Sequence, residues 1–316
     1  MTYLSPSSLS PEAPARSSAD PRPSLQKAWF ETLETSFEND SSTFWAWMRP
    51  GPKPCFTRAL LSDILDQQAL LRDTLSSARR GEAGAAVRWY VMGSRIPGIF
   101  NLGGDLSHFA EKIQARDLGA LRAYGRMCVE AIHGNSEAFQ APTVTIALVQ
   151  GDALGGGFEC ALAFDVIVAE RSAKFGLPEI LFNLFPGMGA YSYLSRRIGP
   201  VQAERMITSG RLYSAEELHA IGLVDVLADD GEGEAAVRDW IERNDRKHNA
   251  LQAIFRARRR ANPVTLAELT DIVDIWSETA LAISDLDVRK MLRLAAAQEK
   301  RLARSGHAAL PAEATA

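Results

Sequence analysis

The sequence predicts an α/β fold with a C-terminal layer of helices. Two apolar runs, Val144–Val149 and 166–169, are rich in β-branched residues and predict buried strands. Longer stretches with apolar residues at helical spacing lie between and after these runs. Strands that alternate with helices indicate a sheet covered by helices. Because 46% of the 316 residues are hydrophobic and 23% are charged, the chain can bury a sizeable core.

The first residues differ in composition from the rest of the chain. Residues 1–24 contain five Pro and seven Ser and few large apolar side chains, so we expect a disordered tail. A tail without function is favoured over a docking motif. Aromatic residues become frequent from Leu25 onward, and the prolines between positions 50 and 54 predict a loop. Apolar residues at helical spacing then predict a helix over 60–78.

In the middle of the chain, segments with the pattern of a strand alternate with segments that have apolar residues at helical spacing. A short apolar run bounded by Gly and charged residues predicts a strand over 87–92. The amphipathic stretch 107–139 predicts one long helix or a broken pair of helices. After Val226 an acidic, glycine-containing segment predicts a linker over 228–234. The periodicity beyond it predicts helices over 235–255, 266–284 and 287–302, with Pro263 separating the first from the second. These elements divide the chain into a tail over 1–24, an α/β core over 25–227 and a helical region over 228–316.

Composition and missing motifs exclude several classes of function. A net charge of −4 lacks the overall basic character of a nucleic-acid-binding protein. Cys55, Cys128 and Cys160 are far apart and form no CxxC pair, and the five His have no metal-ligand spacing, so we expect neither a metal site nor a cofactor. No apolar stretch is long enough to span a membrane, and we expect a cytoplasmic protein. Phosphate-loop, HExxH, GxSxG and GxGxxG motifs are absent.

Three successive glycines follow the strand at Val144–Val149. Gly155, Gly156 and Gly157 lie between apolar segments, so a carbonyl group can approach backbone N–H groups that no side chain covers. Such N–H groups suit a developing oxyanion. For the three glycines alone, a tight strand-to-helix turn is the better explanation. Glu159 favours the functional interpretation, because an ionised carboxylate in an otherwise apolar helix is costly unless it has a partner or a function.

Two further segments add candidates to this first one. Glu179 follows Pro178 in a mostly apolar stretch and supplies a second carboxylate, as acid–base chemistry requires. Taken alone, Glu179 is better explained as an acidic residue in the first turn of a helix. The step Gly103–Gly104 offers a second backbone donor or an ordinary turn before a helix. Each signal is weak alone, whereas the three together are specific.

The motifs resemble those of the enoyl-CoA hydratase/isomerase (crotonase) superfamily. The resemblance spans about 87–226, in order and at matching spacing, through Phe100–Leu106, Leu154–Glu159, Phe175–Glu179, Pro186–Ala190, Ser214–Glu217 and Gly222–Val226. It implies a spiral of ββα units with the C-terminal helices covering the acyl site. It also implies two catalytic glutamates, Glu159 and Glu179. Two positions depart from the pattern: Leu102 replaces a small residue, and Cys160 replaces a common Leu.

The resemblance also assigns the remaining site residues. Gly104 and Gly156 are implied as the donors of the oxyanion hole, with Gly103 and Gly155 beside them and able to exchange roles by one position. Met188, Trp276 and Leu294 are expected to line an apolar tunnel for an acyl chain. For each of these three, an ordinary core position is an equally good interpretation.

Within the superfamily, the Phe-Asn-Leu-Gly-Gly-Asp-Leu segment, the aromatic N-terminal lead and the basic helical tail resemble the DSF synthase (RpfF-type) branch. This resemblance implies dehydration of a 3-hydroxyacyl thioester on acyl carrier protein, followed by hydrolysis to a free cis-2-unsaturated fatty acid that serves as a quorum-sensing signal. An ordinary enoyl-CoA hydratase and a non-catalytic regulatory binding protein are the alternatives. The implied partners are an acyl carrier protein or acyl-CoA substrate, a sensor kinase as regulator, and further copies of the chain in a trimer or hexamer.

The mechanism implied is proton transfer at C2 and C3 of the thioester. The hypothesis places Glu179 at C2 and Glu159 at the departing C3 hydroxyl, although the sequence does not decide which glutamate serves which step. The acid must still hold its proton near neutral pH, so we expect a raised pKa in at least one of the two. The chain also contains a run of basic residues between positions 243 and 260. We interpret this run as either a solvated helix face or a docking surface for an acidic carrier: Arg243, Arg246, Lys247, Arg256, Arg258, Arg259 and Arg260.

Overall fold

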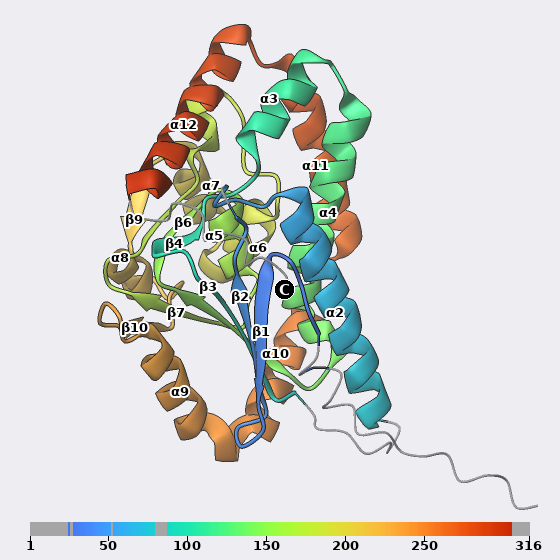
Figure 1. Ribbon diagram of the computed structural model, residues 1–316, viewed down its shortest axis with the longest axis vertical. Helices are drawn as coiled ribbons and strands as arrows, with labels where there is room; N and C mark the ends of the chain where they lie inside the picture. Colours follow the sequence, from blue (N-terminus) through green and yellow to red (C-terminus); the bar gives the residue numbers. More distant parts are fainter. Residues whose placement is uncertain (1–24, 26–27, 52, 80–86, 305–316) are drawn as a thin grey trace, which may run out of the picture.

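The computed structural model describes residues 25, 28–51, 53–79 and 87–304 (Figure 1). The predicted tail over 1–24 and the last twelve residues lie outside this part of the chain. Two sheets form the centre. The larger has the order β1-β2-β3-β5-β7-β10, and the smaller has the order β4-β6-β8-β9. The larger sheet comprises β1 (Leu33–Glu38), β2 (Thr43–Met48), β3 (Trp89–Ser94), β5 (Val144–Val149), β7 (Val166–Glu170) and β10 (Val226–Ala228), and is parallel except for the β1–β2 pair.

The smaller sheet follows the same order along the chain. It comprises β4 (Gly98–Asn101), β6 (Gly151–Leu154), β8 (Lys174–Gly176) and β9 (Leu212–Ser214), and only β8 and β9 are antiparallel. The consecutive pairs β3–β4, β5–β6 and β7–β8 each give one strand to each sheet, and helical segments follow each pair. This repeat confirms the predicted α/β fold and its spiral of ββα units.

Helices cover both sheets, and α2, α3, α9, α11 and α12 begin within two residues of the predicted starts. The α-helices are α2 (Arg58–Arg79), α3 (Leu106–Gln114), α4 (Leu118–Ser136), α5 (Gly156–Leu162), α6 (Ala190–Ile198), α7 (Pro200–Ser209), α8 (Ala215–Ala220), α9 (Gly233–Asn244), α10 (His248–Ala261), α11 (Leu266–Ala282) and α12 (Asp285–Arg304). Three short 3₁₀ segments are η1 (Ala138–Gln140), η2 (Pro178–Phe182) and η3 (Asp245–Lys247). In the described part of the chain, no helix is long and apolar enough to cross a membrane.

Two predicted helices are divided in the structure. The stretch 107–139 is a broken pair, because Arg116 has a positive φ of 51° and Asp117 caps α4 by accepting from the Ala120 N–H at 2.9 Å. The stretch predicted as one helix over 235–255 is two helices, α9 and α10, separated by η3. Long-range contacts fix this break, since Asp245 pairs with Arg88 at 2.6 Å. Periodicity alone does not reveal such a contact.

The C-terminal helices wrap around the body of the molecule in different places. Helices α9 and α10 cover one face of the larger sheet, where a hydrophobic cluster includes Trp45, Trp89 and Val237. Helix α11 packs along α4, and α12 packs against α3 and η2 (Figure 1). Gly125 of α4 lacks a side chain where Val273 of α11 lies closest, which allows these two helices to approach. The last two helices therefore lie over the carboxyl ends of β4 and β6.

Candidate active site

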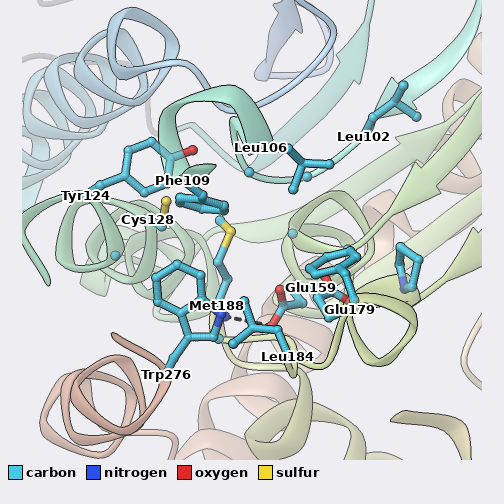
Figure 2. A pocket seen from close by; sticks show the side chains of 18 of the residues that line it. Leu102, Leu106, Phe109, Tyr124, Cys128, Glu159, Glu179, Leu184, Met188 and Trp276 are labelled. Atoms are coloured by element: carbon cyan, nitrogen blue, oxygen red, sulfur yellow. Dashed lines mark hydrogen bonds between the residues drawn. The ribbon is translucent and has the colours of Figure 1, made fainter. Parts of the chain in front are cut away.

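One cavity lies where the smaller sheet meets α4, α11 and α12, with about 610 Å³ of space that includes its opening to solvent. Both candidate glutamates line it, as do the two glycine segments (Figure 2). The three residues expected along an acyl tunnel also line it. The structure therefore brings together all nine residues selected from the sequence, namely Gly103, Gly104, Gly155, Gly156, Glu159, Glu179, Met188, Trp276 and Leu294.

The two glycine segments touch because their strands are neighbours. β4 and β6 pair in parallel, so the residues that follow them emerge at the same edge of the sheet. A Cβ atom on Gly103 would lie 3.0 Å from the amide nitrogen of Gly156, too close for a side chain. Gly103 and Gly155 also have φ values of 95° and 51°, which favour glycine. Glycine is needed here for both the backbone conformation and the close approach.

Hydrogen bonding determines which of the four amides are available. The Gly103 N–H donates to Asn101 Oδ1 at 2.8 Å, and the Gly155 N–H donates to the Gly176 carbonyl at 2.8 Å. Within the described ranges, the amides of Gly104 and Gly156 have no hydrogen-bond partner. These two amides are therefore the ones that can donate to a substrate oxygen in the cavity.

Glu159 is held by the backbone of a neighbouring turn. It lies in the first turn of α5 and is 1% exposed. Its Oε1 accepts from the backbone N–H groups of Met188, at 2.7 Å, and Ala190, at 2.9 Å. Burial raises the pKa of Glu159 to about 7, and these hydrogen bonds oppose the rise because they favour the carboxylate. The sequence prediction of a raised pKa holds for this residue.

Glu179 faces the same cavity from η2. It is half-buried, and in the described part of the chain its Oε2 is buried without a hydrogen-bond partner. Burial raises the pKa of Glu179 to about 8, and the negative charge of Glu159 adds to the rise. Because the two carboxyl groups influence one another, they titrate as a pair, which holds about one proton near neutral pH. A pair of this kind can take a proton at one position and give one at another.

Apolar side chains form the rest of the wall. The Phe109 and Trp276 rings lie 4.8 Å apart, and Met188 extends between them and the glutamates (Figure 2). Sequence reasoning missed Phe109, as well as Leu184 in the loop after η2 and other lining residues on the helices: Leu106, Tyr124, Cys128, Val273 and Gln298. Their apolar spacing looked the same as that of core positions. In the described part of the chain, no group of three His, Cys, Asp or Glu could hold a metal ion.

The departure at Leu102 is accommodated beside the glycines. Its side chain is 4% exposed and packs with Ile96 and Ile99 in a small cluster of its own. The Leu102 carbonyl also accepts from Gln298 of α12 at 3.4 Å. The larger side chain thus anchors the loop that carries Gly103 and still lines the cavity.

One member of the basic run, Arg259, differs from both predicted interpretations, whereas the other six residues are exposed. Arg258 and Arg259 bind the buried Asp165 at 2.8 and 2.6 Å, and Arg258 remains exposed in this pair. Arg259 is only 13% exposed. No residue of the run, within the described chain, lines the cavity that holds the glutamates. The prediction was wrong for Arg259, because its buried partner Asp165 lies far away in sequence.

Comparisons with known proteins match this geometry. The family model described as enoyl-CoA hydratase/isomerase matches residues 67–272. Mouse mitochondrial methylglutaconyl-CoA hydratase is 36% identical over 185 residues, 58% of this chain and 55% of that protein. The 2,3-dehydroadipyl-CoA hydratase of Escherichia coli is 37% identical over 169 residues, 53% of this chain and 63% of that protein. The chain thus spans about half the length of the first curated relatives it matches.

Solved structures agree on the fold. The structure of Pseudomonas aeruginosa DspI is 27% identical with a TM-score of 0.58, and the match covers 75% of this chain and 92% of DspI. An enoyl-CoA hydratase from Bacillus halodurans has a TM-score of 0.67 at 21% identity, covering 83% of this chain and 99% of that one, and shows the fold alone. Since the family model spans more than half of the sequence, the chain belongs to the enoyl-CoA hydratase/isomerase (crotonase) family.

Proposed function

We propose that the protein dehydrates a 3-hydroxyacyl thioester on acyl carrier protein and then hydrolyses the thioester to release a cis-2-unsaturated fatty acid. The observation that supports this proposal most directly is that two carboxyl groups with raised pKa values share one cavity with two backbone amides that have no hydrogen-bond partner in the described part of the chain. The apolar wall supports an acyl substrate. The resemblance to the RpfF-type branch supports the carrier, the product and its role in quorum sensing.

Dehydration removes a proton from C2 and expels the C3 hydroxyl. One carboxylate takes the C2 proton, and negative charge develops on the thioester oxygen. The amides of Gly104 and Gly156 donate to that oxygen, and one such donor is worth about 2.7–4 kcal/mol in comparable sites. The electron pair then forms the C2–C3 double bond, and the protonated carboxyl group delivers its proton to the hydroxyl, which leaves as water.

Hydrolysis of the thioester uses the same groups. A carboxylate takes a proton from a water molecule, and that water adds to the thioester carbon. The resulting tetrahedral oxyanion occupies the position of the earlier enolate oxygen, so the same two amides stabilise it. The carbon–sulfur bond then breaks, and the carrier thiol leaves with a proton from the carboxyl pair.

The hydrogen bonds of the two glutamates favour a second candidate, an ordinary enoyl-CoA hydratase. Glu159 accepts two backbone N–H groups and more readily loses its proton, whereas the Oε2 of Glu179 lacks a partner and Glu179 more readily retains its proton. With Glu179 at C2, this proton distribution suits addition of water to an enoyl thioester. Dehydration requires the proton to start on Glu159. The hydratase names of the curated relatives support the same candidate.

Product analysis on both carriers tests the proposal. Purified protein is incubated with 3-hydroxyacyl-ACP, 3-hydroxyacyl-CoA and 2-enoyl-CoA, and the acids and thioesters are identified by mass spectrometry. Free 2-unsaturated acid from the ACP substrate supports the dehydratase–thioesterase, with Glu159→Ala and Glu179→Ala as inactive controls. Rapid equilibration of the CoA thioesters without free acid supports the hydratase. If both Ala variants match the wild type, the carboxylate pair is not the catalyst.

The other predictions concern the surroundings of the enzyme. Regulation by a sensor kinase, assembly into a trimer or hexamer and a cytoplasmic location stay predictions. A non-catalytic regulatory protein would not need two carboxyl groups with raised pKa values, so we favour an active enzyme.

A further inference from the structure

The cavity has an open end and a closed end. Leu106, Glu179, Leu294 and Gln298 keep part of their surface exposed, and they come from α3, η2 and α12. The lining residues of α4 and α11 are almost completely buried instead, with exposures between 0% and 1% for Tyr124, Cys128 and Val273. The cavity therefore opens between α3, η2 and α12 and ends between α4 and α11.

The closed end lies away from the two carboxyl groups. Figure 2 shows Met188 between the glutamates on one side and Cys128, Tyr124 and Trp276 on the other. A Cβ on Gly156 would clash with Met188 Sδ, so an acyl chain that runs from the glycine amides to the closed end passes Met188 and reaches Cys128. The α4–α11 contact stops it there. A Cβ on Gly125 would lie 2.5 Å from Val273 Cγ1, so no space remains between these two helices.

The chemistry of the closed end is apolar. The Cys128 thiol is buried, and burial raises its pKa, so it stays neutral and acts as a small hydrophobic side chain rather than a nucleophile. The Tyr124 hydroxyl donates to the Phe56 carbonyl and accepts from the Asp105 N–H at 3.1 Å. With its hydroxyl engaged, Tyr124 offers the cavity mainly its ring. Such an end suits the terminal methyl group of a fatty acyl chain.

We infer that Cys128 and Val273 form the stop that sets the acyl-chain length of the substrate. This inference rests on the proposed function only in requiring an acyl thioester, and it applies to either carrier. Up to the stop, each added methylene is buried and should raise kcat/KM about fourfold. Beyond it, a longer chain must displace the α4–α11 contact, and kcat/KM should fall.

Chain-length profiles of two opposite variants test the inference. Val273→Ala removes two methyl groups at the stop, so the preferred chain should lengthen by about two carbons. Cys128→Leu adds bulk, so the preferred chain should shorten by a similar amount. The measurement is kcat/KM over thioesters of increasing length, with circular dichroism to show that each variant is folded. Profiles that match the wild type in both folded variants would overturn the inference.

A matched control separates this effect from general loss of core packing. Val237 is fully buried in α9 and belongs to the other hydrophobic cluster, so Val237→Ala should reduce stability and leave the chain-length preference unchanged. Binding keeps the test independent of turnover. If the wild type converts no thioester, the proposed function fails. Thermal stabilisation by fatty acids of increasing length then decides whether the preferred length moves in Val273→Ala and Cys128→Leu.

Discussion

A buried acid lies at each end of α5, and within the described residues only one of the two acids is paired with positively charged side chains. Just beyond the helix, Asp165 is 3% exposed and pairs with Arg258 and Arg259, and it also accepts from the Thr145 N–H at 3.1 Å. At the start of the helix, Glu159 is equally buried, yet no described cation pairs with it or with Glu179. Two arginines neutralise Asp165, whereas Glu159 and Glu179 become neutral only when they bind a proton.

The difference separates structural from chemical carboxylates. A buried acid with two guanidinium partners holds distant segments together, as Asp165 holds α10 to the core. A buried acid without a cation is costly as a carboxylate and therefore retains a proton that it can give away. Burial alone thus does not mark a catalytic acid. The absence of a compensating charge is the more informative property.

The largest expected effect is a loss of turnover when Glu159 or Glu179, which have no described cation partner, is replaced. Glu159→Gln and Glu179→Gln each remove a proton carrier and keep the shape, so kcat should fall about 10²–10⁴-fold. Thermal melts should show that both variants remain folded. Turnover within tenfold of the wild type in either variant would show that its carboxyl group is not part of the chemistry.

A smaller effect, on stability instead of turnover, is expected at Asp165, which is paired with two arginines. Asp165→Asn leaves two arginines facing a neutral group and should lower the free energy of unfolding by about 3–5 kcal/mol. Denaturant titration measures the loss. The exposed pair of Arg171 with Asp229 provides the control, because Asp229→Asn should cost less than about 1 kcal/mol. Equal losses in the two variants would remove the distinction between the ends.

The smallest effect is a pH-dependent gain in stability at Glu179. Burial raises the pKa of Glu179 in the folded state above its ordinary value of 4.5, so its contribution to stability declines as pH rises toward about 8. Glutamine does not titrate. The melting temperature of Glu179→Gln, relative to the wild type, should therefore increase by a few degrees between about pH 5 and about pH 8.5. A constant difference over this range would contradict the raised pKa.

The fold was predictable where one property dominated a segment. Continuous β-branched residues identified β5 and β7, and periodicity identified α2 and α11. The sequence analysis did not predict β2. All six of its residues are buried, so its aromatic side chains show no alternation with polar residues. The strands of the smaller sheet contain three or four residues each, too few to establish a period.

The site was predictable in its charges and glycines but not in its apolar wall. Glu159 and Glu179 stood out as acids in apolar segments, and family resemblance brought them together. Which glycine amides are available depends on partners such as Asn101 Oδ1, which the sequence does not identify. Cys128 and Val273 could not be distinguished from core positions, because a helix face looks the same whether it meets another helix or a cavity.

The wall supplied by α11 and α12 has a consequence for protein synthesis. Trp276, Leu294 and Gln298 follow both glutamates in the sequence, so they leave the ribosome later. Until α11 and α12 have been made, the cavity lacks these three residues of its wall. The full set of side chains around the two carboxyl groups is thus present only after α12 has been synthesised.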